Sequence, residues 1–145
     1  LPALQIRRLQ SVQNAAARLV FNMRRSDHVN DALICLHWLR VAERITFKVA
    51  VLAYKSLHGQ SPSYLANFDQ TSSDSRRTGL RSSSSNQLRV PHHRLSTIGD
   101  RAFPVAGAVV WNSLPQQVKS ATSLKSFRSR LKTFLFPFSF PALVI

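Results

Sequence analysis

The chain is poor in the residues on which most catalytic and metal sites depend. Its 145 residues include one cysteine, four glycines and six acidic residues. The single cysteine, Cys35, excludes an internal disulfide and a cysteine-based zinc knuckle. The scattered glycines form no phosphate-cradling loop, and no two acidic residues are adjacent. We therefore expect no catalytic site, no cofactor and no small-molecule substrate for this chain alone.

The histidines do not complete a metal site. Cys35 and His37 lack the two further ligands that a tetrahedral site needs. His92 and His93 are adjacent, so their side chains point apart if the segment is extended. We expect no bound metal.

Long apolar runs and a secretory leader are also missing. No apolar run reaches the roughly 18 residues of a membrane-spanning helix. Arg7 and Arg8 interrupt the start, and no cleavage-site pattern follows an apolar stretch. Together with the low cysteine content, this predicts an intracellular protein, nuclear or cytoplasmic.

What the chain has in excess is positive charge. Lysine and arginine number 20, which gives a formal net charge of +14. Such an excess favours a polyanionic partner. Hydrophobic residues make up 44%, which is enough for a folded core. RNA or DNA is the partner that this balance favours, and an anionic membrane surface is the weaker alternative.

Apolar periodicity predicts a mainly α fold, a small helical domain of four or five helices with a flexible basic loop or short hairpin in the middle. The expected helices span Ala3–Met23, His28–Leu36, Val41–Leu57, Arg101–Asn112 and Leu124–Phe136. A short helical turn follows Ser61. The first helix should bury a stripe of Leu9, Val12, Ala16, Leu19 and Met23, and the helix Val41–Leu57 should be the most buried.

Capping residues mark the expected helix ends. Ser26 or Asp27, Asp100 and Ser123 should cap helix N-termini, and Gly59 should end the helix Val41–Leu57. Asn112 is expected to bond to the chain turning at Pro115.

Composition divides the chain into four segments. Residues 1–69 form an N-terminal helical segment, 70–98 a flexible Ser/Arg-rich arm, 99–136 a C-terminal helical pair and 137–145 an apolar, disordered tail. Trp38, Phe47, Tyr54 and Trp111 lie in apolar helical patterns, so we expect them to pack in the core rather than stack on bases.

Four stretches taken together resemble a known family. They are RLQSVQNAAARLVFNMRRSDHV (8–29), LHWLRVAERITFKVAVLAYKSLHGQSPSYL (36–65), GDRAFPVAGAVVWNSLP (99–115) and SLKSFRSRLKTFLF (123–136). In this order they resemble the region after the polymerase domain in reverse transcriptases of non-LTR (LINE-like) retrotransposons, most closely the animal jockey-like group. The resemblance covers nearly all of residues 4–136.

The resemblance implies a context. In such proteins an endonuclease and a polymerase precede this region, which acts as a thumb and C-terminal extension that helps to hold template RNA and target DNA. The aromatic-x-Asp-Asp signature of the polymerase is absent from this chain. The resemblance therefore implies a non-catalytic fragment, with apolar side chains exposed where the rest of the reverse transcriptase would pack.

Basic side chains on several segments are the candidate phosphate contacts. Arginine in particular pairs with phosphate oxygens in bidentate geometry. The candidates are Arg7, Arg8, Arg24 and Arg25 around the first helix; Arg76, Arg77, Arg81, Arg89, Arg94 and Arg101 in and after the arm; and Lys125, Arg128, Arg130 and Lys132 in the last helix.

Three other hypotheses remain open. The helices could brace the polymerase, with incidental charge. A membrane-surface role would require the Leu and Phe stripe of the last helix to be exposed. The chain could also be a decayed retrotransposon relic, since FPFSFPALVI at its end matches nothing in the family.

Overall fold

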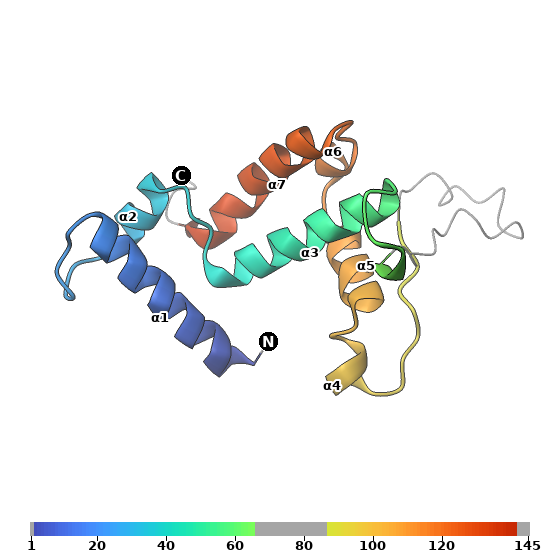
Figure 1. Cartoon of the computed structure of the whole chain (residues 1–145), viewed down its shortest axis with the longest axis horizontal. Helices are drawn as coiled ribbons and strands as arrows, with labels where there is room; N and C mark the ends of the chain where they lie inside the picture. The colour runs from blue at the N-terminus through green and yellow to red at the C-terminus, as the bar shows by residue number, and fades with distance from the viewer. Residues whose placement is uncertain (1, 66–86, 142–145) are drawn as a thin grey trace, which may run out of the picture. The chain divides into compact units, whose positions relative to one another are not determined.

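The chain folds as a small, mainly helical protein, as the sequence predicts. A computed structural model describes residues 2–65 and 87–141 (Figure 1). Four long helices dominate: α1 (Ala3–Val20), α3 (Val41–Leu57), α5 (Phe103–Ser113) and α7 (Leu124–Ser139). Shorter elements are α2 (Asn30–Cys35), the 3-10 helix η1 (Ser63–Leu65), α4 (Ser96–Gly99) and α6 (Gln116–Lys119). No strand forms within the described ranges.

The helices build two compact units. The first comprises residues 1–47 and 132–145, and the second comprises residues 48–131. These units do not follow the four segments expected from composition, because α3 and α7 each contribute to both. Most of the expected arm, with Arg76, Arg77 and Arg81, lies outside the described residues, as do the last four residues.

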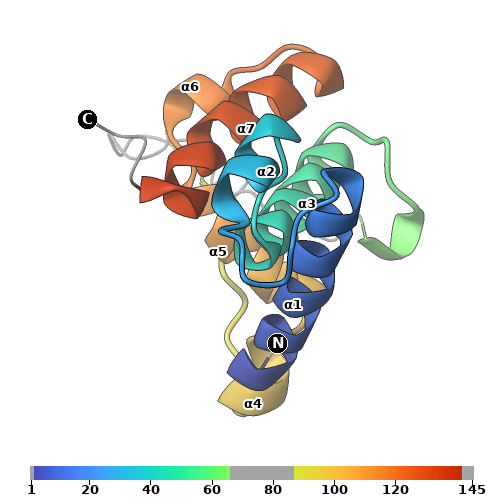
Figure 2. The same ribbon diagram turned by 90° about the vertical axis from the view of Figure 1, so that its left-hand side faces the viewer.

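The core of the first unit is small. Its fully buried members are Ala17 of α1, Ala32 and Leu33 of α2, and Phe140 after α7, with Trp38 and other partly buried side chains packed around them. Figure 2 shows the connection that brings α2 back beside α1.

Two glutamines attach α1 to the start of α3. Gln13 Nε2 donates to the carbonyl oxygen of Leu39 at 2.9 Å, and Gln10 Oε1 accepts from the backbone N–H of Val41 at 2.9 Å. The first N–H groups of a helix have no acceptor within their own helix. Gln10 supplies one from a segment that is 31 residues away.

This attachment decides which face of α1 is buried. Gln13 and Ala17 are buried, whereas Leu9, Val12 and Leu19 are exposed. The predicted burial of those three apolar residues is therefore wrong. Hydrogen bonding through the glutamines turns a polar and small-residue face inward and leaves most of the apolar stripe in solvent.

The end of α7 completes the same unit. The backbone N–H of Arg40 donates to Ser139 Oγ at 3.1 Å, and this hydroxyl donates to Glu43 Oε2 at 3.3 Å. Ser139 and Phe140 are both buried, and the Arg40 guanidinium lies 5.6 Å from the Phe140 ring centroid. The expected disordered tail at 137–145 is therefore wrong up to Phe140.

Aromatic residues organise the second unit. Tyr54 of α3 stacks on Phe127 of α7 with ring centroids 4.4 Å apart, and Phe127 stacks on Trp111 of α5 at 6.0 Å. The Tyr54 hydroxyl donates to the carbonyl oxygen of Ala121 at 3.2 Å. All three rings are buried, which confirms core packing for Tyr54 and Trp111.

Helix α3 is buried mainly in its C-terminal half. Ala50, Val51, Ala53 and Tyr54 are buried there, while Leu52 is partly in solvent. The predicted boundaries of this helix, Val41–Leu57, match the structure.

Three consecutive helices end in the same way. A residue with positive φ follows each of α1, α2 and α3: Asn22 (50°), His37 (53°) and Gly59 (65°). The next N–H in each case reaches back to the final turn, as in a Schellman motif: Met23 to Arg18, Trp38 to Leu33 and Gln60 to Lys55, at 2.8–2.9 Å. The predicted end at Gly59 is confirmed.

The predicted N-caps are correct in one place only. Ser123 Oγ accepts from the N–H of Ser126 at 3.2 Å and caps α7. Asp27 instead accepts from the N–H of Arg24 at 2.7 Å, and Val29 occupies the N-cap position of α2. Asp100 does not cap α5 either, because that helix begins after Ala102.

Candidate nucleic-acid interface

Every candidate arginine and lysine within the described ranges is exposed. Among the described residues, none of these side chains forms an ion pair with a carboxylate. The ion pair found there joins His93 to Asp100. The positive charge of these side chains is therefore not neutralised by the described protein groups. Exposed, unneutralised guanidinium and ammonium groups are what phosphate contacts require.

Helix α1 separates two pairs of candidate arginines. Arg7 and Arg8 lie in its first half, and Arg24 and Arg25 lie in the turn that follows it. At 1.5 Å per residue, the part of the helix between Arg8 and Val20 is about 18 Å long and keeps the two pairs apart. The turn is fixed by Asp27, which bonds to the backbone of Arg24 in both directions. The two pairs are thus separate contact points and not one cluster.

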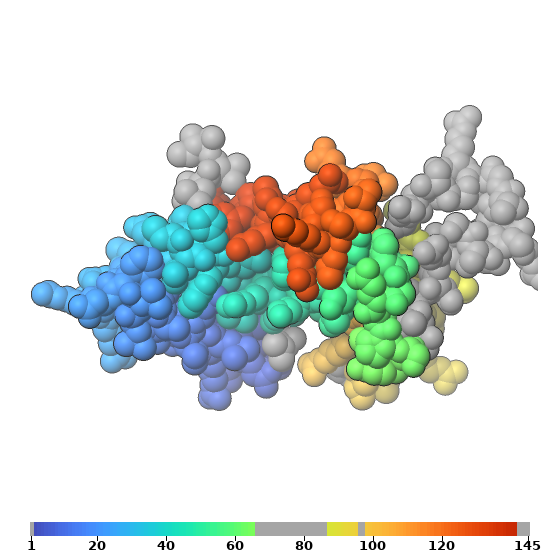
Figure 3. Space-filling view, turned by 45° about the horizontal axis from the view of Figure 1, so that its top comes forward, coloured from blue at the N-terminus to red at the C-terminus, as the bar shows by residue number. Residues whose placement is uncertain are grey.

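Helix α7 brings three basic residues onto one face. Lys125, Arg128 and Lys132 follow at i, i+3 and i+7, which places them along one side of a helix. Phe127 and Leu131 lie on the neighbouring side of the helix and are buried. In the space-filling view of Figure 3, the outer side of α7 is open to the viewer.

Arg130 differs from its neighbours on α7. Its Nη1 donates to the carbonyl oxygen of Gln117 at 2.8 Å and lies 3.4 Å from Ser120 Oγ. These groups belong to the last turn of α6 and its C-cap, where carbonyl groups lack helical partners. Arg130 therefore contributes to local structure, although its side chain remains exposed.

The described part of the arm has no helix from residue 87 to residue 95, and α4 begins within it at Ser96. Arg89 and Arg94 lie in this stretch, and Arg101 lies between α4 and α5. The segment is attached at Leu88, whose backbone bonds to the side chain of Asn112. The expectation that Asn112 bonds to the chain near Pro115 is therefore wrong for its side chain.

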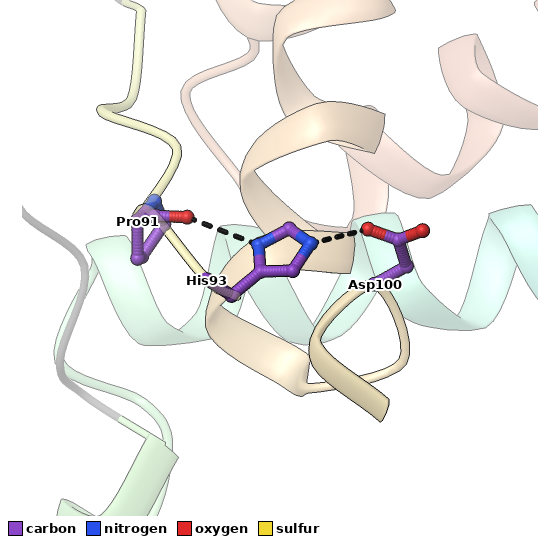
Figure 4. A network of polar contacts seen from close by, with 3 residues as sticks. All are labelled: Pro91, His93 and Asp100. Atoms are coloured by element: carbon purple, nitrogen blue, oxygen red, sulfur yellow. Dashed lines mark hydrogen bonds and ion pairs between the residues drawn. The ribbon is translucent and has the colours of Figure 1, made fainter. Parts of the chain in front are cut away.

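A second attachment joins His93, which precedes Arg94, to Asp100, which precedes Arg101. His93 Nε2 and Asp100 Oδ1 are 2.6 Å apart, and His93 Nδ1 lies 3.4 Å from the carbonyl oxygen of Pro91 (Figure 4). The imidazole lies so close to Gly99 that a Cβ at this position would overlap it. The pair fixes the segment that presents both arginines.

Some of the other basic side chains have hydrogen-bond partners within the fold. Part of the excess positive charge therefore has a structural role. Arg18 donates to the carbonyl oxygen of Asp27, Arg40 to Asn30 Oδ1, and Lys119 to the carbonyl oxygen of Asn112. The Arg44 guanidinium lies over the Trp38 ring. Desolvation by partial burial lowers the pKa of Lys119. Sequence reasoning left Arg44 and Lys48 out, although both are exposed on α3, because they interrupt an apolar helix.

The described residues contain no group of three histidine, cysteine or acidic side chains that could hold a metal ion. Nor is any described helix long and apolar enough to cross a membrane.

No protein-family model, curated protein or solved structure matches the chain. The α7 stripe bears on one alternative directly, since Phe127, Leu131 and Leu135 are buried. A membrane-surface role for α7 would need that stripe in solvent, so this helix does not support it.

Proposed function

We propose that this chain is a non-catalytic nucleic-acid-binding module that holds RNA or DNA through phosphate contacts. Its setting would be the region that follows the polymerase in a non-LTR retrotransposon reverse transcriptase, to which its sequence motifs are similar. The observation that carries the proposal is the exposure of all described candidate arginines and lysines without carboxylate partners.

The arrangement favours sequence-independent binding. Contacts to phosphate fix position on a nucleic acid but carry no sequence information. The candidate contacts sit on separate elements: the two ends of α1, the arm and one face of α7. A duplex or single strand that touches several of them would release counterions at each contact, so affinity should fall steeply with salt.

Titration at several salt concentrations tests this function. On duplex DNA, the log–log slope of the association constant against salt should be about −0.9 per phosphate contact, and somewhat smaller in magnitude on single strands. Replacement of Arg76, Arg77, Arg81, Arg89 and Arg94 together by Gln should reduce that slope by several units. Helical circular dichroism should be unchanged, because Arg89 and Arg94 are exposed.

Two results would count against parts of the proposal. An unchanged slope in the folded arm variant would show that the arm does not touch phosphate, and a variant lacking Arg7, Arg8, Arg24 and Arg25 would then be compared. Failure of the parent chain to bind RNA and DNA at low salt would show that it is not a nucleic-acid-binding module.

A further inference from the structure

The exposed side of α1 has the pattern of a helix-packing seam. Leu9, Val12, Ala16 and Leu19 follow with spacings of three, four and three residues, as the a and d positions of a heptad do. Such a stripe is narrower than the apolar face of a helix that covers a core. Val12 is 69% exposed and Leu19 is 83% exposed, so the seam has no partner among the described residues of its own unit.

The neighbouring side of the same helix is already in use. Gln10 and Gln13 bond to the start of α3, and Ala17 lies in the core of the first unit. α1 is therefore held by one face and presents the other. A rotation that buried the seam against its own unit would break both glutamine contacts.

The centre of the seam permits close approach. Ala15 and Ala16 occupy its middle, between Val12 and Leu19. Small residues let a second backbone come near, while larger side chains on either side interlock with the partner. This profile suits one packed helix better than a flat surface.

The charge around the seam selects the partner. Residues 1–26 contain no acidic residue. Arg8 directly precedes the seam residue Leu9, the g position in this register, and Arg7, Arg18, Arg24 and Arg25 add to the positive field. A second copy of this helix would bring arginines against arginines. A partner helix with carboxylates beside its apolar stripe would be attracted instead.

We propose that the Leu9–Leu19 face of α1 is a docking site for an amphipathic helix of a protein, with an apolar stripe flanked by glutamate or aspartate. The apolar seam itself makes no phosphate contact, although Arg7, Arg8, Arg24 and Arg25 beside it are also candidate phosphate contacts of the proposed function. It would link the chain to a neighbouring protein surface while α7 and the arm remain open.

A pair of synthetic helical peptides can test the site with the full chain. The probe is a fluorescently labelled peptide with Leu at a and d and Glu at e and g, and its control carries Lys in place of Glu. Fluorescence anisotropy should show that the Glu peptide binds and the Lys peptide does not. Added salt should weaken the Glu peptide's binding, since part of the attraction is between charges.

Variants of the chain locate the binding. The double variant Val12→Asn, Leu19→Asn should bind the Glu peptide about tenfold more weakly or worse, because two central apolar contacts are lost. The matched control is Ile98→Asn, which changes a residue that is 70% exposed on α4 and should bind like the parent. Circular dichroism checks that each variant is folded.

Three outcomes would overturn the proposal. They are failure of the parent to bind the Glu peptide, equal binding by the double variant, and equal loss in the Ile98→Asn control. Binding of the chain to vesicles of phosphatidylcholine and phosphatidylserine is measured as a further test. Vesicle binding that depends on Val12 and Leu19, without peptide binding, would show that the seam faces lipid and not a helix.

Discussion

The side chain of Asn112 forms two hydrogen bonds with the backbone of Leu88. Its Nδ2 donates to the Leu88 carbonyl oxygen at 2.8 Å, and its Oδ1 accepts from the Leu88 N–H at 2.8 Å. One amide thus satisfies both polar groups of a buried residue in a stretch without helix. The contact fixes the extended segment to the end of α5, next to Trp111 in the core.

Loss of the donor half of this contact should destabilise the second unit. Asn112→Asp retains an acceptor but places a carboxylate beside the Leu88 carbonyl oxygen. We expect the free energy of unfolding to fall by about 1–3 kcal/mol, the usual cost of an unsatisfied buried polar group. Urea denaturation followed by circular dichroism measures this. The neighbouring Ser113→Ala serves as an exposed control, and equal stability of Asn112→Asp and the parent would contradict the assignment.

The aromatic stack should tolerate truncation poorly. Phe127 is fully buried between Tyr54 and Trp111. Phe127→Ala should cost about 3–5 kcal/mol through lost burial and a residual cavity. Phe127→Leu retains more volume and should cost less, so it keeps the comparison measurable if the alanine variant unfolds. Val109→Ala, at an exposed site on α5, should change stability little, and a similar loss there would point to a general effect.

The residues with positive φ that follow α1 and α3 should respond differently to alanine and to glycine, as measured by stability. Gly59→Ala would place a Cβ on a residue with positive φ, and Asn22→Ala would replace a residue type that tolerates positive φ, at a cost of about 1 kcal/mol each. At Gly59 no atom lies within 4 Å of the added Cβ, so the cost is conformational and not steric. Asn22→Gly should cause no loss. Thermal unfolding of the three variants checks the order, and a stable Gly59→Ala would refute it.

The basic face of α7 predicts a salt effect without a stability effect. Lys125→Gln, Arg128→Gln and Lys132→Gln combined should reduce the magnitude of the salt slope on duplex DNA by about 0.9 for each residue that contacts phosphate. All three are exposed, so the helical signal should persist. Lys48→Gln on α3 is the matched control, with one exposed charge removed outside the candidate set. A slope that changes equally per charge in both variants would indicate a diffuse field and not a contact face.

Much of the fold follows from local sequence rules. The periodicity of residues 41–57, Gly59 at the helix end and Ser123 at the start of α7 each act within a few residues of the element that they define. Such short-range signals survive in the structure because tertiary contacts do not oppose them. The two wrong caps, Asp27 and Asp100, show the limit, since each found a different partner nearby.

The orientation of α1 could not be predicted in the same way. Apolar periodicity identifies the more hydrophobic face but carries no information about hydrogen bonds to residues far along the chain. Gln10 and Gln13 reach Val41 and Leu39, and these contacts override the stripe. The same limitation applies to Asn112, whose partner Leu88 is 24 residues away.

For the candidate interface, the sequence identified which basic side chains are exposed. It did not show which of them lie together on one face of the structure. The i, i+3, i+7 spacing on α7 was present in the sequence. The hydrogen bond from Arg130 to Gln117 could not be predicted, because α6 itself was not expected. The separation of Arg8 from Arg24 by the length of α1 does follow from the predicted helix.

The path of the chain through the first unit sets an order of events during synthesis. Ser139 and Phe140 leave the ribosome after the second unit, yet they bond to and pack against groups near Arg40 and Ala17. The N-terminal helices must therefore wait, with an unfinished core, for the whole second unit to be translated. Domains commonly fold as they emerge, N-terminal part first. Here the first unit is begun before the second unit and completed after it.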